Sequence, residues 1–199
     1  MQPMLGNGGA RVVVCHCMSK ATIPMTAAVV PAHALGSLDQ ADACPVPSAA
    51  QAPDDDQLVE ALASARTIAV VGASPNEART SHQIAVWLIE DTPLQVFLVN
   101  PAAGDAEILG HAFYDSIADL PTPPDIVDVF RRREYVGPIA DDAIAADARV
   151  LWLQLGVVND EAIQRAQAAG LLGVQNRCIK VEYARLSDRI DAAREDGQS

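Results

Sequence analysis

A phosphate-binding corner is the chemistry to which the residues around Gly72 are best suited. Gly72 ends the apolar run 68–71 and leads into Ala73 and Ser74, and a helical pattern begins near Thr80. Glycine lets the backbone approach a ligand closely, and the unpaired N–H groups of a helix start attract negative charge. The fingerprint G-x-G-x-x-G of dinucleotide sites is absent, because only Gly72 is present. The corner predicts a ligand with nucleotide-like phosphates; the alternative is a strand-turn-helix without a ligand.

Basic residues follow the predicted strands, although the chain as a whole is acidic. Arg79 precedes the first helix of the corner, where its guanidinium can pair with a phosphate through two hydrogen bonds. Arg131 begins a triplet of arginines that follows Phe130, and Arg177 follows the last predicted strand. These positions favour an anionic ligand. The alternatives are a solvated surface position for Arg79 and ion pairing at a helix start for the triplet.

No catalytic set is evident in the regular part of the sequence. His82 and His111 are its only histidines, and neither is spaced to pair with a nucleophile or a metal ligand. Ser74 does not lie in the G-x-S-x-G motif of hydrolases. Structural or capping roles are predicted for Asp125 and Asp128. The residues therefore favour a binding protein over an enzyme.

Charge and cysteine usage exclude several classes of partner. The formal net charge of −12 argues against nucleic acid or an anionic membrane as a partner. No apolar run approaches the ~20 residues that span a bilayer. The four cysteines have no zinc-binding spacing, and we expect them to be reduced in a cytoplasmic protein: Cys15, Cys17, Cys44 and Cys178.

The chain of 199 residues divides near residue 56. Residues 1–56 are rich in Ala and Pro and lack periodicity, which predicts a disordered tail or translated sequence upstream of a start at Met18 or Met25. Residues 57–195 alternate between apolar runs and helical patterns. The predicted strands are 67–71, 95–99, 125–130, 150–155 and 172–175. This pattern predicts a Rossmann-like, doubly wound α/β domain of three layers, with a mainly parallel five-stranded sheet.

In such sheets the ligand lies beyond the carboxyl ends of the strands. Several short motifs follow these ends in order over about residues 57–186, and as a series they resemble the small single-domain CoA-binding proteins. Their Rossmann-like domain is similar to that of succinyl-CoA synthetase α subunits. The motifs are 71–74 with Arg79 and Ser81, 99–101, 128–131, 151–156 with Asn159, and 176–178 with Glu182. The family usually has Asp-Arg-Cys where this chain has Asn176-Arg177-Cys178.

The resemblance implies that coenzyme A (CoA) or an acyl-CoA binds with its ADP part at the glycine corner. Cys178 would then form a mixed disulfide with the CoA thiol or pack as a small apolar residue. The implied ligand-binding residues are Gly72, Ala73, Ser74, Arg79, Ser81, Asn100, Pro101, Phe130, Arg131, Gly156, Asn176, Arg177 and Cys178.

Two enzymatic alternatives remain open at this point. An NAD(P)-dependent oxidoreductase would normally present Asp or Glu after the second strand, where this chain has Asn100 followed by Pro101. An accessory subunit of an acyl-CoA ligase would require a phosphohistidine domain and an ATP-grasp partner. We therefore favour a non-catalytic CoA-binding module.

Overall fold

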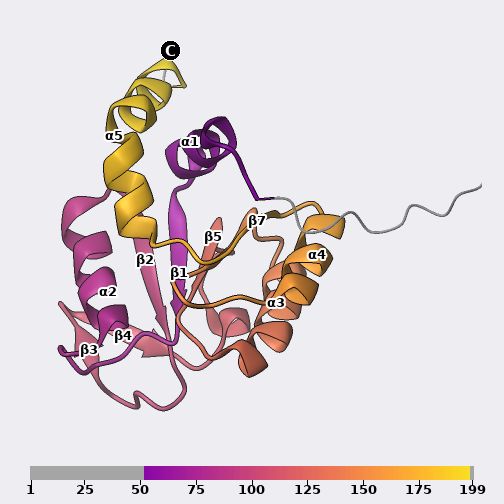
Figure 1. Cartoon of the computed structure of the whole chain (residues 1–199). Helices are drawn as coiled ribbons and strands as arrows, with labels where there is room; N and C mark the ends of the chain where they lie inside the picture. The colour runs from indigo at the N-terminus through magenta and orange to yellow at the C-terminus, as the bar shows by residue number, and fades with distance from the viewer. Residues whose placement is uncertain (1–51, 198–199) are drawn as a thin grey trace, which may run out of the picture. The chain divides into compact units, whose positions relative to one another are not determined.

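The computed structural model describes residues 52–197, and the remaining residues at both ends lie outside this description (Figure 1). The tail predicted to be disordered covers residues 1–56, and its residues 1–51 lie outside the described residues. The predicted boundary after residue 56 falls inside helix α1, which spans Asp55–Ser64. Asp54 caps this helix, because its Oδ1 accepts a hydrogen bond from the backbone N–H of Gln57 at 2.9 Å. No helix among residues 52–197 is long and apolar enough to cross a membrane.

A seven-stranded sheet forms the centre of the fold, with the order β3-β4-β2-β1-β5-β6-β7. Six strands are parallel, and only β3 runs antiparallel to its neighbour. All five predicted strands are present, within one or two residues at their ends. The strands are β1 (Thr67–Val71), β2 (Gln95–Val99), β3 (Glu107–Ile108), β4 (His111–Tyr114), β5 (Ile126–Val129), β6 (Val150–Leu153) and β7 (Leu172–Val174).

The prediction of five strands was wrong because it missed β3 and β4 as a sheet hairpin. The two strands are joined by Leu109 and Gly110, both of which have positive φ, 49° and 78°. Two such residues in succession form the tight turn that suits an antiparallel hairpin. Strands of two and four residues are too short for an alternating pattern, and Leu is a poor signal for a left-handed position.

The six parallel strands follow the order of dinucleotide-binding Rossmann folds. Numbered along the chain, they lie in the order 3-2-1-4-5-6 across the sheet, with β4 as the third strand. The direction of winding reverses at β1, which pairs with β2 on one side and β5 on the other. The crevice at the carboxyl ends of β1 and β5 is therefore the position where this fold binds ligands.

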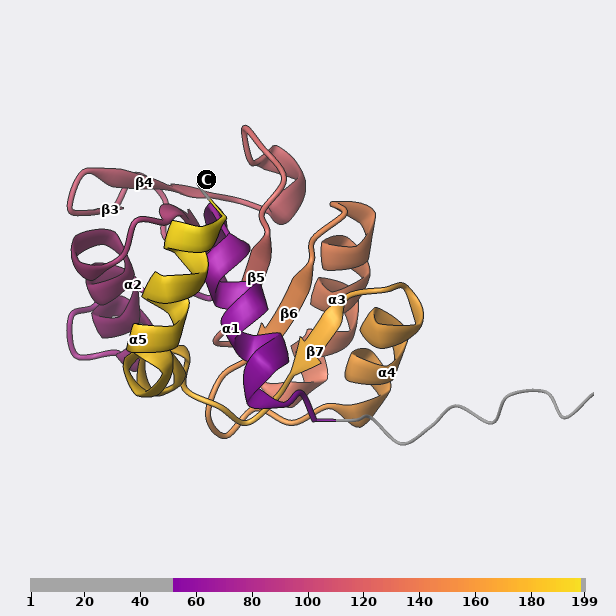
Figure 2. The ribbon, with the colours of Figure 1, turned by 90° about the horizontal axis from the view of Figure 1, so that it is seen from above.

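Successive side chains of the buried strands point to opposite faces of the sheet and pack into two hydrophobic clusters, one on each face. Ile68 and Val70 belong to one cluster, and Ala69 and Val71 belong to the other. Helices α1, α2 and α5 supply the first cluster, and α3 and α4 supply the second. The view from above shows these two groups of helices on opposite sides of the sheet (Figure 2). The further helices are α2 (Thr80–Asp91), α3 (Val136–Ala145), α4 (Asp160–Ala168) and α5 (Ile179–Asp196).

Two predicted boundary residues define helix α4. Asn159 caps it, since its Oδ1 accepts a hydrogen bond from the Ala162 N–H at 3.1 Å. Gly170, with φ of 94°, follows the helix and ends it. The structural role predicted for Asp125 is confirmed at the opposite, amino edge of the sheet. Its Oδ2 accepts hydrogen bonds from the backbone N–H groups of Arg66 and Thr67, at 2.8 and 3.1 Å, and thereby fixes the start of β5 beside β1.

Candidate functional site

Backbone hydrogen bonds beside Gly72 hold together the carboxyl ends of β2, β1 and β5. The N–H of Gly72 donates to the carbonyl oxygen of Val99 at 2.8 Å, and the N–H of Phe130 donates to that of Val71 at 2.8 Å. Gly72 has φ of 87°, a left-handed conformation that favours glycine. A Cβ at this position would lie 2.7 Å from Cδ of Arg131 and 2.9 Å from the carbonyl oxygen of Phe130. The predicted glycine corner is thus a position where no side chain fits.

Asn100 braces the glycine corner from the neighbouring strand. Its Nδ2 donates to the carbonyl oxygen of the buried Ala73 at 2.7 Å, and its Oδ1 accepts from the Ala102 N–H at 3.1 Å. Its own N–H donates to the carbonyl oxygen of Tyr114 at the end of β4, at 2.9 Å. A carboxylate has no hydrogen to donate to Ala73. The residue that replaces the NAD-type carboxylate therefore has a structural role in this corner.

Helix α2 begins beside the corner. Ser74 accepts a hydrogen bond from the N–H of Asn76 through its Oγ, at 3.2 Å, and its carbonyl oxygen lies 3.0 Å from Nδ1 of His82. Arg79 is the N-cap residue of α2, and its exposed side chain makes no hydrogen bond or ion pair within residues 52–197. Ser81, in the first turn, is buried. The N-terminus of α2 and an unengaged guanidinium therefore lie at the same end of the sheet.

The arginine triplet does not act as one unit. Arg131 is half-buried, lies against Gly72, and places its guanidinium 5.2 Å from the ring centroid of Tyr135. Arg132 and Arg133 are exposed. Among the three, only Arg131 lines a hollow of about 230 Å³ at the ends of β1, β2 and β4. Its other lining residues are Val71, Gly72, Val99, Pro101, Asp115, Ser116, Ile117, Tyr135, Pro138, Ile139 and Asp142.

A second group of predicted residues joins the loops after β6 and β7. The N–H of Gly156 donates to Oδ1 of Asn176 at 2.9 Å, and the N–H of Asn176 donates to the carbonyl oxygen of Val157 at 3.2 Å. Gly156 and Asn176 both have positive φ, 84° and 56°. Asn tolerates this conformation better than most residues with a side chain. Asn176 therefore fixes the shape of both loops through a neutral oxygen.

Arg177 and Cys178 lead from β7 into helix α5. The carbonyl oxygen of Arg177 accepts a hydrogen bond from Nε1 of Trp152 at 2.8 Å, and its Nη1 lies 3.8 Å from Oε2 of Glu182. Cys178 is the N-cap residue of α5, half-buried against the cluster formed with α1 and α2. Trp152 is fully buried, so its indole ties this loop directly to the core.

Sequence reasoning missed the burial of Asp128 and its partner Gln154. Asp128 is not a capping residue, because it lies within β5 between Val70 of β1 and Trp152 of β6. Its side chain is fully buried, and Nε2 of Gln154 donates to both of its oxygens at 3.0 and 3.1 Å. Burial raises the pKa of Asp128 to about 8, although the bonds from Gln154 act in the opposite direction. The signal available in the sequence was one carboxyl group inside a four-residue apolar strand.

All predicted ligand-binding residues lie at or just beyond the carboxyl ends of the strands or at the start of α2. Gly72, Asn100 and Phe130 hold the strand ends together by hydrogen bonds at the point where the winding reverses, and Arg131 packs against Gly72. No cluster of three or more His, Cys, Asp or Glu side chains suited to a metal ion occurs within residues 52–197. The arrangement is therefore suited to holding an anionic ligand through arginines and backbone N–H groups.

The strand order and the glycine corner define a Rossmann-like domain. The CoA binding domain family matches residues 66–184, and the chain belongs to this family. It is 37% identical over 134 residues to the uncharacterized protein YneT of Bacillus subtilis. The matched region covers 67% of this chain and 97% of that protein. Cell-free ID.343 from Thermus thermophilus is 34% identical, with a TM-score of 0.64 over 67% of this chain and 99% of the other. A hypothetical protein of Pyrococcus horikoshii is 32% identical, with a TM-score of 0.63 over 74% and 99%.

Proposed function

We propose that this protein binds CoA or an acyl-CoA without catalysing a reaction on it. The ADP part lies at the glycine corner, where the backbone at Gly72 approaches the diphosphate and the N-terminus of α2 faces its charge. Arg79, Arg131 and Arg177 pair with the phosphate groups. The observation that carries the proposal is the position of Gly72 beneath Arg131, at the point of the sheet where this fold takes its ligands.

The second strand end favours CoA over a dinucleotide. NAD sites usually grip the ribose 2′-hydroxyl with a carboxylate after this strand. In this protein Asn100 occupies the position and uses its amide to hold Ala73. CoA instead carries a 3′-phosphate in addition to its diphosphate, and the arginines after β5 and β7 and at the start of α2 match that extra charge.

The geometry also favours a non-catalytic role. A hydrogen bond from His82 to the carbonyl oxygen of Ser74 requires the proton on Nδ1, so Nε2 is the nitrogen left to accept a proton, and within residues 52–197 no hydroxyl or thiol is hydrogen-bonded to it. Asp128 is closed off inside the sheet. Within residues 52–197 no nucleophile lies beside a general base, and we assign no catalytic residue. A cytoplasmic location, expected from the reduced cysteines, belongs to the same proposal.

Calorimetric titration with CoA, acetyl-CoA, NAD and NADP tests the proposal. We expect CoA to bind more tightly than either dinucleotide, with an affinity that falls as salt rises because the phosphate contacts are ionic. NADP is a more stringent comparison than NAD, since it carries an extra phosphate, as CoA does. Tighter binding of NAD or NADP, or hydride transfer to a carbonyl substrate, would overturn the CoA assignment and favour an oxidoreductase.

A further inference from the structure

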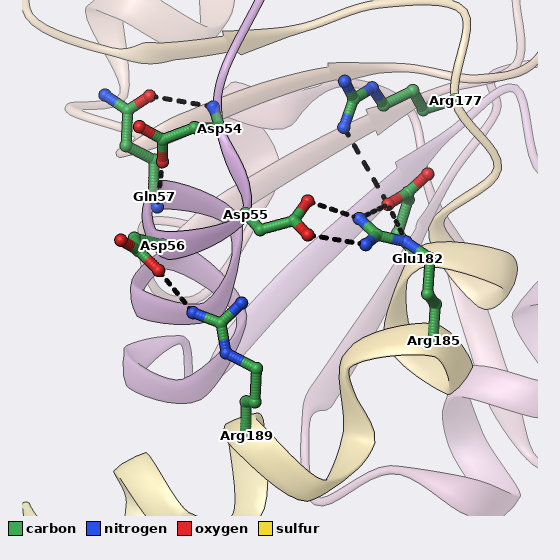
Figure 3. A network of polar contacts seen from close by, with 8 residues as sticks. All are labelled: Asp54, Asp55, Asp56, Gln57, Arg177, Glu182, Arg185 and Arg189. Carbon is green, nitrogen blue, oxygen red and sulfur yellow. Dashed lines mark hydrogen bonds and ion pairs between the residues drawn. The ribbon is translucent and has the colours of Figure 1, made fainter.

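A chain of charged residues joins the start of helix α1 to a residue of the candidate site (Figure 3). The carboxylate of Asp55 accepts two hydrogen bonds from the guanidinium of Arg185 on α5, at 2.6 and 2.7 Å. Arg185 also donates to Oε2 of Glu182, at 2.7 and 3.2 Å. The same oxygen of Glu182 lies 3.8 Å from Nη1 of Arg177. Asp55 and Arg177 are thus linked through two intermediate side chains.

Glu182 is the residue that connects Arg185 to Arg177, because its carboxylate contacts both. Its side chain is 14% exposed, compared with 30% for Arg177 and 43% for Arg185. A carboxylate partly withdrawn from water interacts more strongly with its cations than a fully exposed one does. The short contacts of Glu182 go to Arg185, and its contact with Arg177 is longer than a hydrogen bond. Arg177 is therefore held near Glu182 without being fully engaged by it.

A second ion pair joins the same two helices without reaching the site. Arg189, about one helical turn beyond Arg185, pairs with Asp56. Within the described residues this pair makes no hydrogen bond or ion pair with Glu182 or Arg177. It offers a control of matched charge, because Asp56 and Asp55 are adjacent on α1.

We propose that Asp55, Arg185 and Glu182 are positioning residues that set how freely Arg177 can engage a phosphate of the bound ligand. The inference rests on the proposed function, which assigns Arg177 to the ligand. Ligand binding at the carboxyl edge and the contact between α1 and α5 are then coupled. Arg185, which binds Asp55 of α1, also compensates the charge of Glu182, and Glu182 attracts Arg177.

The two ends of the contact between Asp55 and Arg185 have opposite effects in this arrangement. Without Asp55, the guanidinium of Arg185 pairs with Glu182 alone and neutralises its charge more completely. Glu182 then attracts Arg177 less strongly. Without Arg185, Arg177 is the remaining ion-pair partner of Glu182 within residues 52–197, and the carboxylate of Glu182 is less compensated near the phosphate. A purely structural role predicts that both substitutions act alike, since both break the same bidentate contact.

Titration of the full chain with CoA separates these roles. We expect Asp55→Asn to raise the affinity and Arg185→Gln to lower it, each by about two- to fivefold, the size of effect that ion pairs near a surface produce. The controls Asp56→Asn and Arg189→Gln change the net charge equally and should have smaller effects. Shifts of Asp55→Asn and Arg185→Gln in the same direction, or no larger than those of their controls, would overturn the proposal.

A measurement without ligand keeps this inference distinct from the proposed function. The Nε–Hε NMR resonance of Arg177, identified by its loss in Arg177→Lys, should shift in Asp55→Asn and Arg185→Gln but not in the two controls. Failure of the wild-type protein to bind CoA would reject the proposed function alone. An unmoved Arg177 resonance would reject the positioning network, whatever the ligand.

Discussion

The side chain of Arg131 occupies the space that a β-carbon on Gly72 would need. The distance from such a Cβ to Cδ of Arg131 would be 2.7 Å, and the carbonyl oxygen of Phe130 would be 2.9 Å away. The side chain of Arg131 can move, but the carbonyl oxygen belongs to the backbone of Phe130, directly after β5. The backbone after β5 therefore lies so close to the end of β1 that position 72 requires glycine.

We expect Gly72→Ala to lower both the free energy of unfolding and the affinity for CoA. The positive φ of 87° costs a residue with a side chain about 1–2 kcal/mol, and the forced shift of β5 adds a further cost. Gly110→Ala is the control, because Gly110 has φ of 78° with no atom within 4 Å of its Cβ position. Urea unfolding should show the larger loss for Gly72→Ala, and equal losses would contradict the predicted clash.

Arg79→Ala should weaken CoA binding by about 1.5–3 kcal/mol, the range for hydrogen bonds to charged groups. Stability should not change, because the side chain is exposed and makes no polar contact within residues 52–197. Arg79→Lys should recover only part of the affinity, since an ammonium group lacks the planar fork of guanidinium. Calorimetry checks the affinity, and an unchanged dissociation constant in the Ala variant would make Arg79 a solvated surface residue.

Asp128 should make the protein less stable as the pH rises from about 4 to 8. Burial raises its pKa in the folded state to about 8, whereas the ordinary value is 3.8. Between these values the folded state keeps a proton that the unfolded state loses, so stability falls by up to about 1.4 kcal/mol per pH unit and levels off above pH 8. Below pH 4 both states are protonated, and this contribution is fully present.

Asp128→Asn removes this titration while keeping an oxygen that can accept from Gln154. Urea unfolding at intervals from pH 5 to 9 should show wild type losing stability relative to the variant as the pH rises. Comparison of the two proteins cancels the pH dependence that other titratable groups contribute, such as that of Asp125. Burial acts to raise the pKa of Asp125, but the hydrogen bonds from Arg66 and Thr67 outweigh burial and lower it. Parallel pH profiles would show that Asp128 is already ionised in the folded state.

Two truncations that differ by five residues test where the folded unit begins. Deletion of residues 1–51 keeps the buried Pro53 and the three acidic residues Asp54, Asp55 and Asp56, and should leave the melting temperature and CoA affinity unchanged. Deletion of residues 1–56 removes the capping box, in which Asp54 and Gln57 bond each other's backbone N–H groups. The lost cap alone costs about 1 kcal/mol, or about 2–4 °C in melting temperature. A similar loss in the shorter deletion would show that the N-terminal segment packs on the domain.

The fold was predictable wherever buried strands and helical periods were long enough to read. Runs such as 67–71 and 95–99 are apolar on both faces, so they identified parallel strands covered by helices. The position of β4 beyond β2 was not predictable, because pairing in a sheet is decided by packing over long distances in the chain. The hairpin at Leu109 also escaped notice, since its turn lacks the usual Asn-Gly or Asp-Gly signal.

At the candidate site, position along the chain was easier to predict than the direction of a side chain. The strand-end rule brought Gly72, Asn100, Phe130 and Arg177 to one edge without any knowledge of contacts. It gave no means of seeing that Asn100 binds a carbonyl oxygen, or that Arg131 alone of its triplet lines the hollow. Those details depend on which residue each side chain faces across the sheet.

The hydrogen bond from Trp152 to the carbonyl oxygen of Arg177 gives the protein an internal optical reporter. Indole emission responds to the hydrogen bonding and polarity around the ring, and this ring is buried in the core with its N–H on the loop that enters α5. The sequence contains two tryptophans, and the other is Trp87. In a Trp87→Phe background the fluorescence spectrum comes from Trp152 alone. A displacement of the Arg177 backbone then appears as a spectral shift, which makes events at the ligand edge visible without an attached dye.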